Sequence, residues 1–132
     1  MKDVAEGMEE TKITIKTLTP SLNKLLRMHW AERKKLKDDL AWEVFAELQK
    51  QNPEYEVILL PQKAKLEITS YRKSFLDKDN FIGGLKLLID AIKELRIIYD
   101  DSPEFLTLKA TQKIEKKRKN QRTEITIYRP SP

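Results

Sequence analysis

Four aspartates are the strongest candidates for reactive groups in this sequence. Asp77 and Asp79 stand two residues apart in the segment LDKDNFIGGLK, and the pair Asp100 and Asp101 follows later. On extended chain, side chains two residues apart point the same way, so Asp77 and Asp79 can face one site, to which a short strand can return the later pair. Converging carboxylates form the oxygen-rich site that suits Mg²⁺ or Mn²⁺. Two such ions can clamp the attacking and leaving oxygens of a phosphodiester displacement.

A second interpretation of the same aspartates is purely structural. Asp79 can cap the N-terminus of a helix, and Asp100 and Asp101 can form a turn, because both are common uses of aspartate. The segment is not an EF-hand: where that loop needs a ligand, a glycine and a glutamate, the sequence has Phe81, Ile82 and Leu88. A nucleotidyltransferase could use the same D-x-D pattern, but no Gly-Ser phosphate loop precedes it.

The composition excludes several other kinds of site. The sequence has no cysteine and one histidine, His29, which rules out disulfides, thiolate metal sites and the common zinc sites. His29 is predicted to cap a helix or to pack against one. Trp30 and Trp42 are expected in the core, with stacking on nucleic-acid bases as the alternative. Because no apolar stretch is long enough for a membrane span or a signal peptide, the sequence predicts a soluble, cytoplasmic protein that does not bind membranes.

Positive charge is concentrated in two blocks. The net charge of the chain is +5, but residues 24–37 carry a net +5 and residues 109–122 a net +6, which leaves −6 for the rest. Such blocks attract polyanions such as nucleic acid. The alternative is that both blocks are solvated faces without a partner.

The apolar patterns along the chain predict an α+β domain, with a mixed sheet and helices packed on one face. The length of 132 residues fits one domain, whose residues 1–10 are expected to be flexible. The predicted elements are a strand over 11–17, a helix over 29–49, strands over 55–60 and 66–71, a helix over 81–95, and strands over 97–99, 105–114 and 123–128. The strands on either side of Pro61 are expected to be neighbours, and the last two to form a hairpin with the basic tip KKRKNQR.

Two adjacent glycines, Gly83 and Gly84, stand near the start of the second predicted helix. Each lowers the helix propensity by about 1 kcal/mol relative to alanine. Their presence indicates either a close approach of the backbone to a ligand or a kinked start of the helix.

Three segments together resemble the RusA family of Holliday junction resolvases. They are D-K-D-N (Asp77 to Asn80), L-K-L-L-I-D-A-I (Leu85 to Ile92) and I-I-Y-D-D-S (Ile97 to Ser102). The resemblance is closest to phage and prophage members, which also tend to carry Gly-Gly here and a run similar to P-S-L-N-K-L-L-R-M-H-W (Pro20 to Trp30). It covers most of the chain from about residue 20 to residue 128.

The resemblance implies a dimeric, Mg²⁺-dependent endonuclease of mixed α/β fold, in which three aspartates bind metal and a lysine assists. By position, the metal ligands are Asp77, Asp79 and Asp101, with Asp100 as a further carboxylate beside them. The lysine of the family pattern falls at Gly83 when it is counted from the asparagine, so it is assigned to Lys86, which has the matching place relative to the helix.

The predicted function is therefore a structure-selective endodeoxyribonuclease that resolves four-way DNA junctions in recombination and repair. It is expected to act as a homodimer with Mg²⁺, or with Mn²⁺, without an organic cofactor, in a bacterial or phage-infected cell. The alternatives are a branched-DNA-binding protein of the same fold that does not cleave, or a structural dimer. The predicted phosphate contacts are Arg27, Arg33, Lys34, Lys35, Lys73 and Lys78. The role of the basic tip is left open.

Overall fold

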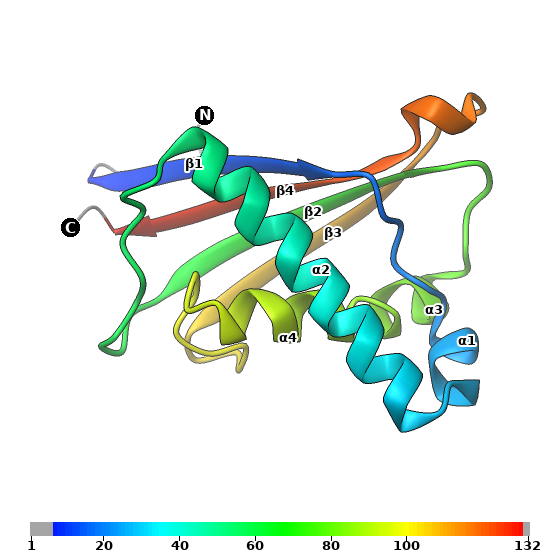
Figure 1. The fold of residues 1–132 in the computed structure, drawn as a ribbon, viewed down its shortest axis with the longest axis horizontal. Coiled ribbons are helices and arrows are strands. Elements are labelled where there is room, and N and C mark those ends of the chain that lie inside the picture. Colours follow the sequence, from blue (N-terminus) through cyan, green and yellow to red (C-terminus); the bar gives the residue numbers. More distant parts are fainter. Residues whose placement is uncertain (1–6, 131–132) are drawn as a thin grey trace.

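The computed structural model describes residues 7–130 and contains a four-stranded sheet with helices on one face (Figure 1). The strands are β1 Met8–Ile15, β2 Ala64–Arg72, β3 Leu106–Ile114 and β4 Arg122–Pro130. The helices are α1 Leu22–Arg27, α2 Trp30–Gln51, α3 Lys78–Gly83 and α4 Lys86–Glu94, with a short 3-10 turn, η1, at Arg118–Asn120. This arrangement confirms the predicted α+β class. Within the described residues, no helix is long and apolar enough to span a membrane.

The sheet has the strand order β1-β4-β2-β3 and is mixed. The strand β4 runs antiparallel to both β1 and β2, whereas β2 and β3 are parallel and are joined through α3 and α4. Because β2 lies between β3 and β4, the predicted hairpin of the last two strands is wrong, and residues 115–121 form a connection that passes β2. An alternating pattern shows that a strand is half-buried, but it does not say which strand is its neighbour.

The core lies between the sheet and the long helices. Across the central strands, Leu66 pairs with Ile127 and Ile68 with Ile125, and all four side chains are buried. The helices α2 and α4 cover them with a further set of buried side chains, which comprises Leu40, Val44, Leu48, Leu88, Ala91 and Ile92.

The N-terminus of α2 is fixed by a local signal, and His29 has the predicted capping role. The His29 Nδ1 accepts a hydrogen bond from the Ala31 amide at 3.2 Å, and Glu32 accepts one from the His29 amide at 3.0 Å. The expectation that Trp30 and Trp42 lie in the core is wrong, because their side chains are 65% and 67% exposed.

Two predicted strands are loops in the structure. Residues 55–60 and 97–99 have no ladder partners, although Ile58, Ile97 and Ile98 are buried. The apolar residues of these segments are buried, as their composition indicates. A strand also needs a neighbouring strand whose backbone N–H and C=O groups are free to form hydrogen bonds. The flexible start is also corrected in part: Met8 to Glu10 belong to β1, and residues 1–6 lie outside the described part of the chain.

One buried arginine ties these loops to the sheet. The Arg129 side chain, on β4, is 3% exposed and its Nε donates to Glu9 Oε1 at 2.8 Å. Its other nitrogens donate to the carbonyl oxygens of Ile97, at 3.1 Å, and Glu56, and the guanidinium lies 4.0 Å from the centre of the Tyr55 ring. The guanidinium, which has five N–H donors, therefore supplies hydrogen bonds to carbonyl oxygens of the two loops that have no strand neighbour.

The adjacent glycines mark the break between α3 and α4, so the kinked start of the second predicted helix is present. A Cβ atom on Gly84 would lie 1.8 Å from the carbonyl oxygen of Pro20, and one on Gly83 would meet the Leu22 side chain at 2.8 Å. The backbone therefore approaches the segment before α1, and not a ligand. This contact sets how closely α1 packs on α3.

We expect Gly84→Ala to lower the free energy of unfolding by about 3 kcal/mol, the upper end of the usual range for overpacking. Gly83→Ala is the matched control, because Leu22 is flexible and alanine favours the helix by about 1 kcal/mol. Urea unfolding followed by circular dichroism would compare the two variants. Equal stability of both would contradict the close packing at Gly84.

Candidate functional site

Asp77 caps the N-terminus of α3, a role that the structural interpretation had given to Asp79. Its carboxylate accepts hydrogen bonds from the Asn80 amide at 3.0 Å and from Asn80 Nδ2 at 2.9 Å. These two bonds, the backbone bond foremost, hold the pKa of Asp77 below its usual value. Asn80 Oδ1 in turn accepts from the Asn23 amide at 2.9 Å, which links α1 to α3. The asparagine of D-K-D-N therefore positions the first aspartate.

Asp79 lies in the first turn of α3 and is exposed. Its carboxylate makes no hydrogen bond or ion pair with any residue between 7 and 130. Asp77 and Asp79 thus form an exposed pair of carboxylates directly after the loop that follows β2. We call this pair the β2-end carboxylates.

Asp100 and Asp101 follow α4 and share one lysine. The Lys93 Nζ lies 3.0 Å from Asp100 Oδ1 and 3.7 Å from Asp101 Oδ1. The hydrogen bond from Lys93, followed by one from Ser102, lowers the pKa of Asp100 to about 2. We call Asp100 and Asp101 the β3-start carboxylates. Lys93 is not among the residues predicted from the sequence, although a lysine in the last turn of a helix that is followed by an acidic pair is a recognisable signal.

The structure does not bring the two carboxylate pairs together in one chain. One pair follows the end of β2 and the other precedes the start of β3, and in parallel strands these points lie at opposite ends of the sheet. Figure 1 shows α3 and the turn after α4 at the two ends of α4. Among residues 7–130, no three histidine or acidic side chains are grouped so that they could hold a metal ion. The predicted return of Asp100 and Asp101 to Asp77 and Asp79 is therefore absent from the single chain.

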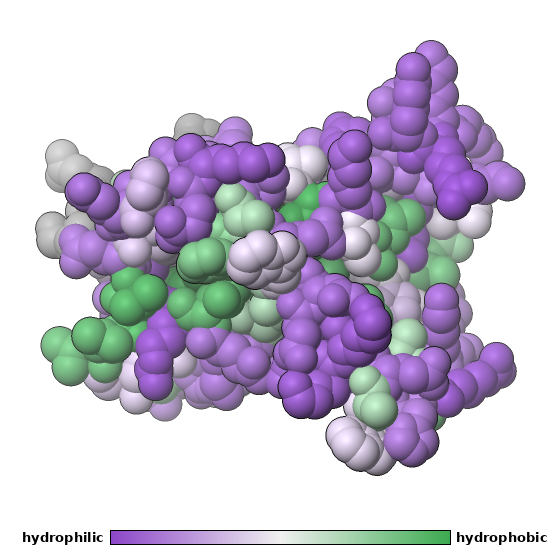
Figure 2. Space-filling model, viewed as in Figure 1, coloured by the Kyte–Doolittle hydropathy of each residue, from purple (hydrophilic) through white to green (hydrophobic). Residues whose placement is uncertain are grey.

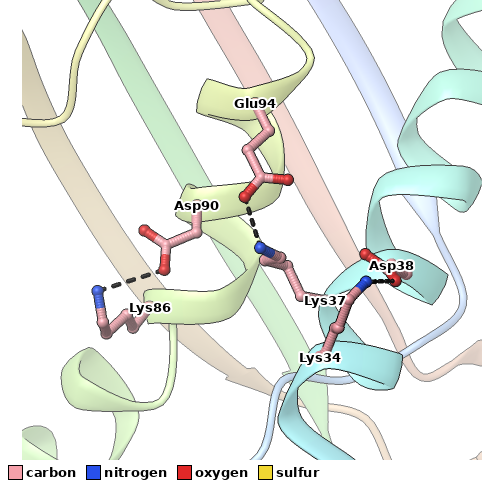
Figure 3. A network of polar contacts seen from close by, with 6 residues as sticks. All are labelled: Lys34, Lys37, Asp38, Lys86, Asp90 and Glu94. Carbon is pink, nitrogen blue, oxygen red and sulfur yellow. Dashed lines mark hydrogen bonds and ion pairs between the residues drawn. The ribbon is translucent and has the colours of Figure 1, made fainter. Parts of the chain in front are cut away.

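Lys86 begins α4 and points along the helix to Asp90 (Figure 3). Its Nζ lies 3.2 Å from Asp90 Oδ2. In the same region Lys37 of α2 pairs with Glu94 of α4 at 2.5 Å, and the hydrogen bond that Lys37 donates to the Glu94 carboxylate raises the pKa of Lys37. The Lys37–Glu94 pair connects α2 to α4, whereas the Lys86–Asp90 pair lies within α4. They leave Lys86 on an exposed face, bound to a carboxylate that is not one of the predicted metal ligands.

The predicted phosphate contacts differ in how free their charges are. On α2, Lys34 pairs with Asp38 at 2.8 Å and Lys35 with Asp39 at 2.9 Å. The remaining predicted contacts are exposed and form no ion pair in the described part of the chain; they are Arg27, Arg33, Lys73 and Lys78. Two of these are close in sequence to the β2-end carboxylates: Lys73 precedes the pair and Lys78 stands between its two members.

A cleft of about 610 Å³ lies beside the loop that leads to Asp77. It is lined by residues 17–21, by the first turns of α2, and by Arg72 and Leu76. Arg72 donates to the Thr19 carbonyl oxygen at 2.8 Å and to Ser70 Oγ at 2.9 Å, and burial lowers its pKa. The sequence analysis did not identify Arg72, because its role depends on a contact with a distant segment.

The comparisons with known proteins give no identification. No protein-family model matches the sequence, and no curated protein matches it. The resemblance to RusA resolvases therefore remains a prediction from the three quoted segments.

We expect Lys93→Met to raise the pKa of Asp100 from about 2 toward its ordinary value of 3.8, because the variant lacks the hydrogen-bonded ammonium. A carboxyl whose pKa is lower in the folded state stabilises the fold above about pH 4 and loses this contribution as the pH falls toward 2. Carboxyl NMR titration would measure the pKa directly.

Lys86→Met is the matched control for this titration. It removes a lysine of the same helix whose partner is Asp90, so the pKa of Asp100 should stay near 2. An unchanged pKa of Asp100 in Lys93→Met would show that Lys93 is not its partner in solution.

Proposed function

We propose that this chain is a Mg²⁺-dependent endodeoxyribonuclease that acts on four-way DNA junctions as a homodimer, in the cytoplasm of a bacterial or phage-infected cell. The observation that supports the proposal best is the state of the D-K-D-N segment. It presents two exposed carboxylates at one helix start, with a pKa below the usual value at Asp77 and an uncommitted carboxylate at Asp79. Oxygen ligands of this kind suit Mg²⁺ or Mn²⁺.

A homodimer would supply what one chain lacks. Each chain has a β2-end pair and a β3-start pair at opposite ends of the α3–α4 crossover. In a closed twofold dimer, a contact between the β2-end pair of one subunit and the β3-start pair of its partner occurs twice by symmetry. Two complete sites would result, and a four-way junction needs two related strands to be nicked. The single chain does not fit a metal ion bound by Asp77, Asp79 and Asp101, so the proposed site requires Asp101 from the partner subunit.

The residues of this chain would have separate tasks in such a site. Asn80 fixes the direction of the Asp77 carboxylate, and the hydrogen bond from Lys93 lowers the pKa of Asp100 to about 2. A divalent ion supplies positive charge against the phosphate oxygens, whose negative charge increases in the transition state. Lys86 would add a second positive charge if it leaves Asp90, a surface pair that is worth little in water.

We expect Asp77→Asn, Asp79→Asn and Asp101→Asn each to abolish cleavage while junction binding is unchanged or tighter. Each change removes one negative charge from a metal ligand and reduces repulsion of the phosphates. The assay is incubation of labelled four-way junction and linear duplex with Mg²⁺, Mn²⁺ or EDTA. Asp39→Asn is the control, because Asp39 lies on α2 and pairs with Lys35. Full activity in any two of the three variants would refute the site.

The shared site can be tested by mixing two inactive variants. If Asp79 and Asp101 of different subunits meet, a mixed dimer of Asp79→Asn and Asp101→Asn chains has one intact site and one doubly altered site. We therefore expect the mixture to recover nicking of one strand by the mixed dimers, which make up about half of all dimers when equal amounts of the two chains pair at random.

Light scattering should show a particle of twice the chain mass of 15.6 kDa. The control for the mixture is Asp77→Asn with Asp79→Asn, which lie on the same side of the proposed site and should not rescue each other. A dimer without rescue in either mixture would mean that the carboxylate pairs do not meet between subunits.

A second candidate function is junction binding without cleavage. It is favoured by the absence of a metal-binding group within residues 7–130 of one chain. Junction binding in EDTA, together with no nicking in Mg²⁺ or Mn²⁺ at any protein concentration, would support it.

A further inference from the structure

The strongest unassigned feature is a group of cations along β3 and the connection to β4. Its members are exposed and form no ion pair within the described residues; they are Lys109, Lys113, Lys116, Lys117, Arg118 and Lys119. We call them the β3–β4 basic surface. Figure 1 shows the connection projecting beyond the end of the sheet, and Figure 2 shows hydrophilic side chains standing out there.

This surface differs from the other basic block, on α1 and α2, in how many of its cations pair with carboxylates of the protein. Lys34, Lys35 and Lys37 each pair with a carboxylate of the protein. In the β3–β4 segment the one acid between residues 109 and 122 is Glu115, and its carboxylate accepts from the Lys117 amide at 3.2 Å. The two blocks have similar net charge in sequence, but the second has more cations available to an outside anion.

The connection is held in one shape by its own contacts. The guanidinium of Arg122 lies 3.8 Å from the centre of the Tyr71 ring, and it donates to the Asn120 carbonyl oxygen at 2.7 Å and to Glu124 at 2.9 Å. Gln121 Nε2 donates to the Glu115 carbonyl oxygen at 3.1 Å. A preformed basic turn loses less conformational entropy on binding than a flexible one.

Residues 115–121 of the basic surface lie at the same end of the sheet as the β2-end carboxylates, because β2 and β3 are parallel and both end there, while Lys109 lies in the middle of β3. Two contacts connect them. Gln112 of β3 accepts from the Leu76 amide and donates to the Leu76 carbonyl oxygen, both at 2.9 Å, directly before Asp77. The Glu115 amide donates to the Arg72 carbonyl oxygen at 2.8 Å. A polyanion held by the basic surface would thus be fixed relative to Asp77 and Asp79.

We propose that the β3–β4 basic surface binds the phosphate backbone of a DNA duplex arm beside the β2-end carboxylates. The identity of the polyanion as DNA rests on the proposed function. A linear polyanion fits the arrangement, since Lys109 and Lys113 stand about 13 Å apart at 3.3 Å per residue of strand and the turn extends the same row. An acidic membrane fits less well, because residues 115–121 have no apolar side chain to enter a bilayer.

The test compares two triple variants by fluorescence anisotropy with labelled four-way junction and duplex, in EDTA over a range of salt concentrations. The first is Lys116→Gln, Lys117→Gln and Lys119→Gln. The matched control is Lys34→Gln, Lys35→Gln and Lys37→Gln, whose ammonium groups pair with carboxylates, so it also tests whether Lys34 and Lys35 contact phosphates as predicted from the sequence. Each phosphate contact contributes about 0.9 to the slope of log affinity against log salt. We expect the first variant to lose about 2 to 3 units of slope and at least tenfold in affinity, and the control less than 1 unit.

Two outcomes would overturn the proposal: an unchanged slope in the first variant, or an equal or larger loss in the control. Stronger binding of phosphatidylserine vesicles than of DNA by the unaltered protein would also overturn it. Circular dichroism shows whether each variant is folded, and Lys109→Gln with Lys113→Gln gives a second probe on β3 that should lose about 1 to 2 units.

Cleavage of the junction by the unaltered protein in Mg²⁺ is measured in parallel. Cleavage with an unchanged slope would refute this surface and leave the nuclease intact. Slope loss without any cleavage would support the surface and refute the nuclease.

Discussion

The parallel pairing of β2 with β3 is the constraint on which the rest of this structure depends. It requires a crossover that returns the chain to the start of the sheet, and α3 and α4 provide it. The crossover buries the apolar face of α4 against the sheet and places Asp77 and Asp101 at its two ends. A strand pairing thus both builds the core and separates the carboxylates, so any site that needs both pairs has to be assembled between chains.

Contacts between residues far apart in the sequence hold the segments that the strand ladders do not fix. Arg129 secures two apolar loops that lack strand partners, and Gln112 fixes the backbone just before Asp77. The Gly84 backbone lies against Pro20, which brings α1 close to α3. Each of these contacts replaces hydrogen bonds or packing that regular secondary structure would otherwise supply. The contacts of Gln112 and Gly84 position the segment that carries the D-K-D-N motif.

The positive charge that a surface of this protein offers to an outside anion depends more on ion pairing than on the number of basic residues. The two basic blocks have almost the same net charge, yet the lysines of α2 face aspartates one helical turn away, while those of the β3–β4 connection face solvent. Pairs on an exposed helix are weak, but they lower the charge that a distant phosphate meets. The same reasoning applies to Asp100, whose low pKa comes from Lys93.

The sequence by itself determined the α+β class, the long helix and the location of the four strands, because periodicity depends on neighbours within a few residues. It narrowed His29 to capping or packing, and the structure shows the cap. Tertiary structure alone decided that β4 lies between β1 and β2, that residues 55–60 and 97–99 are loops, and that the two aspartate pairs are apart. Strand order depends on which backbone edges meet, and apolar patterns are the same for every order. The sequence indicated Asp77 and Asp101 as candidate site residues, but the distance between them depends on the length and course of the α3–α4 crossover.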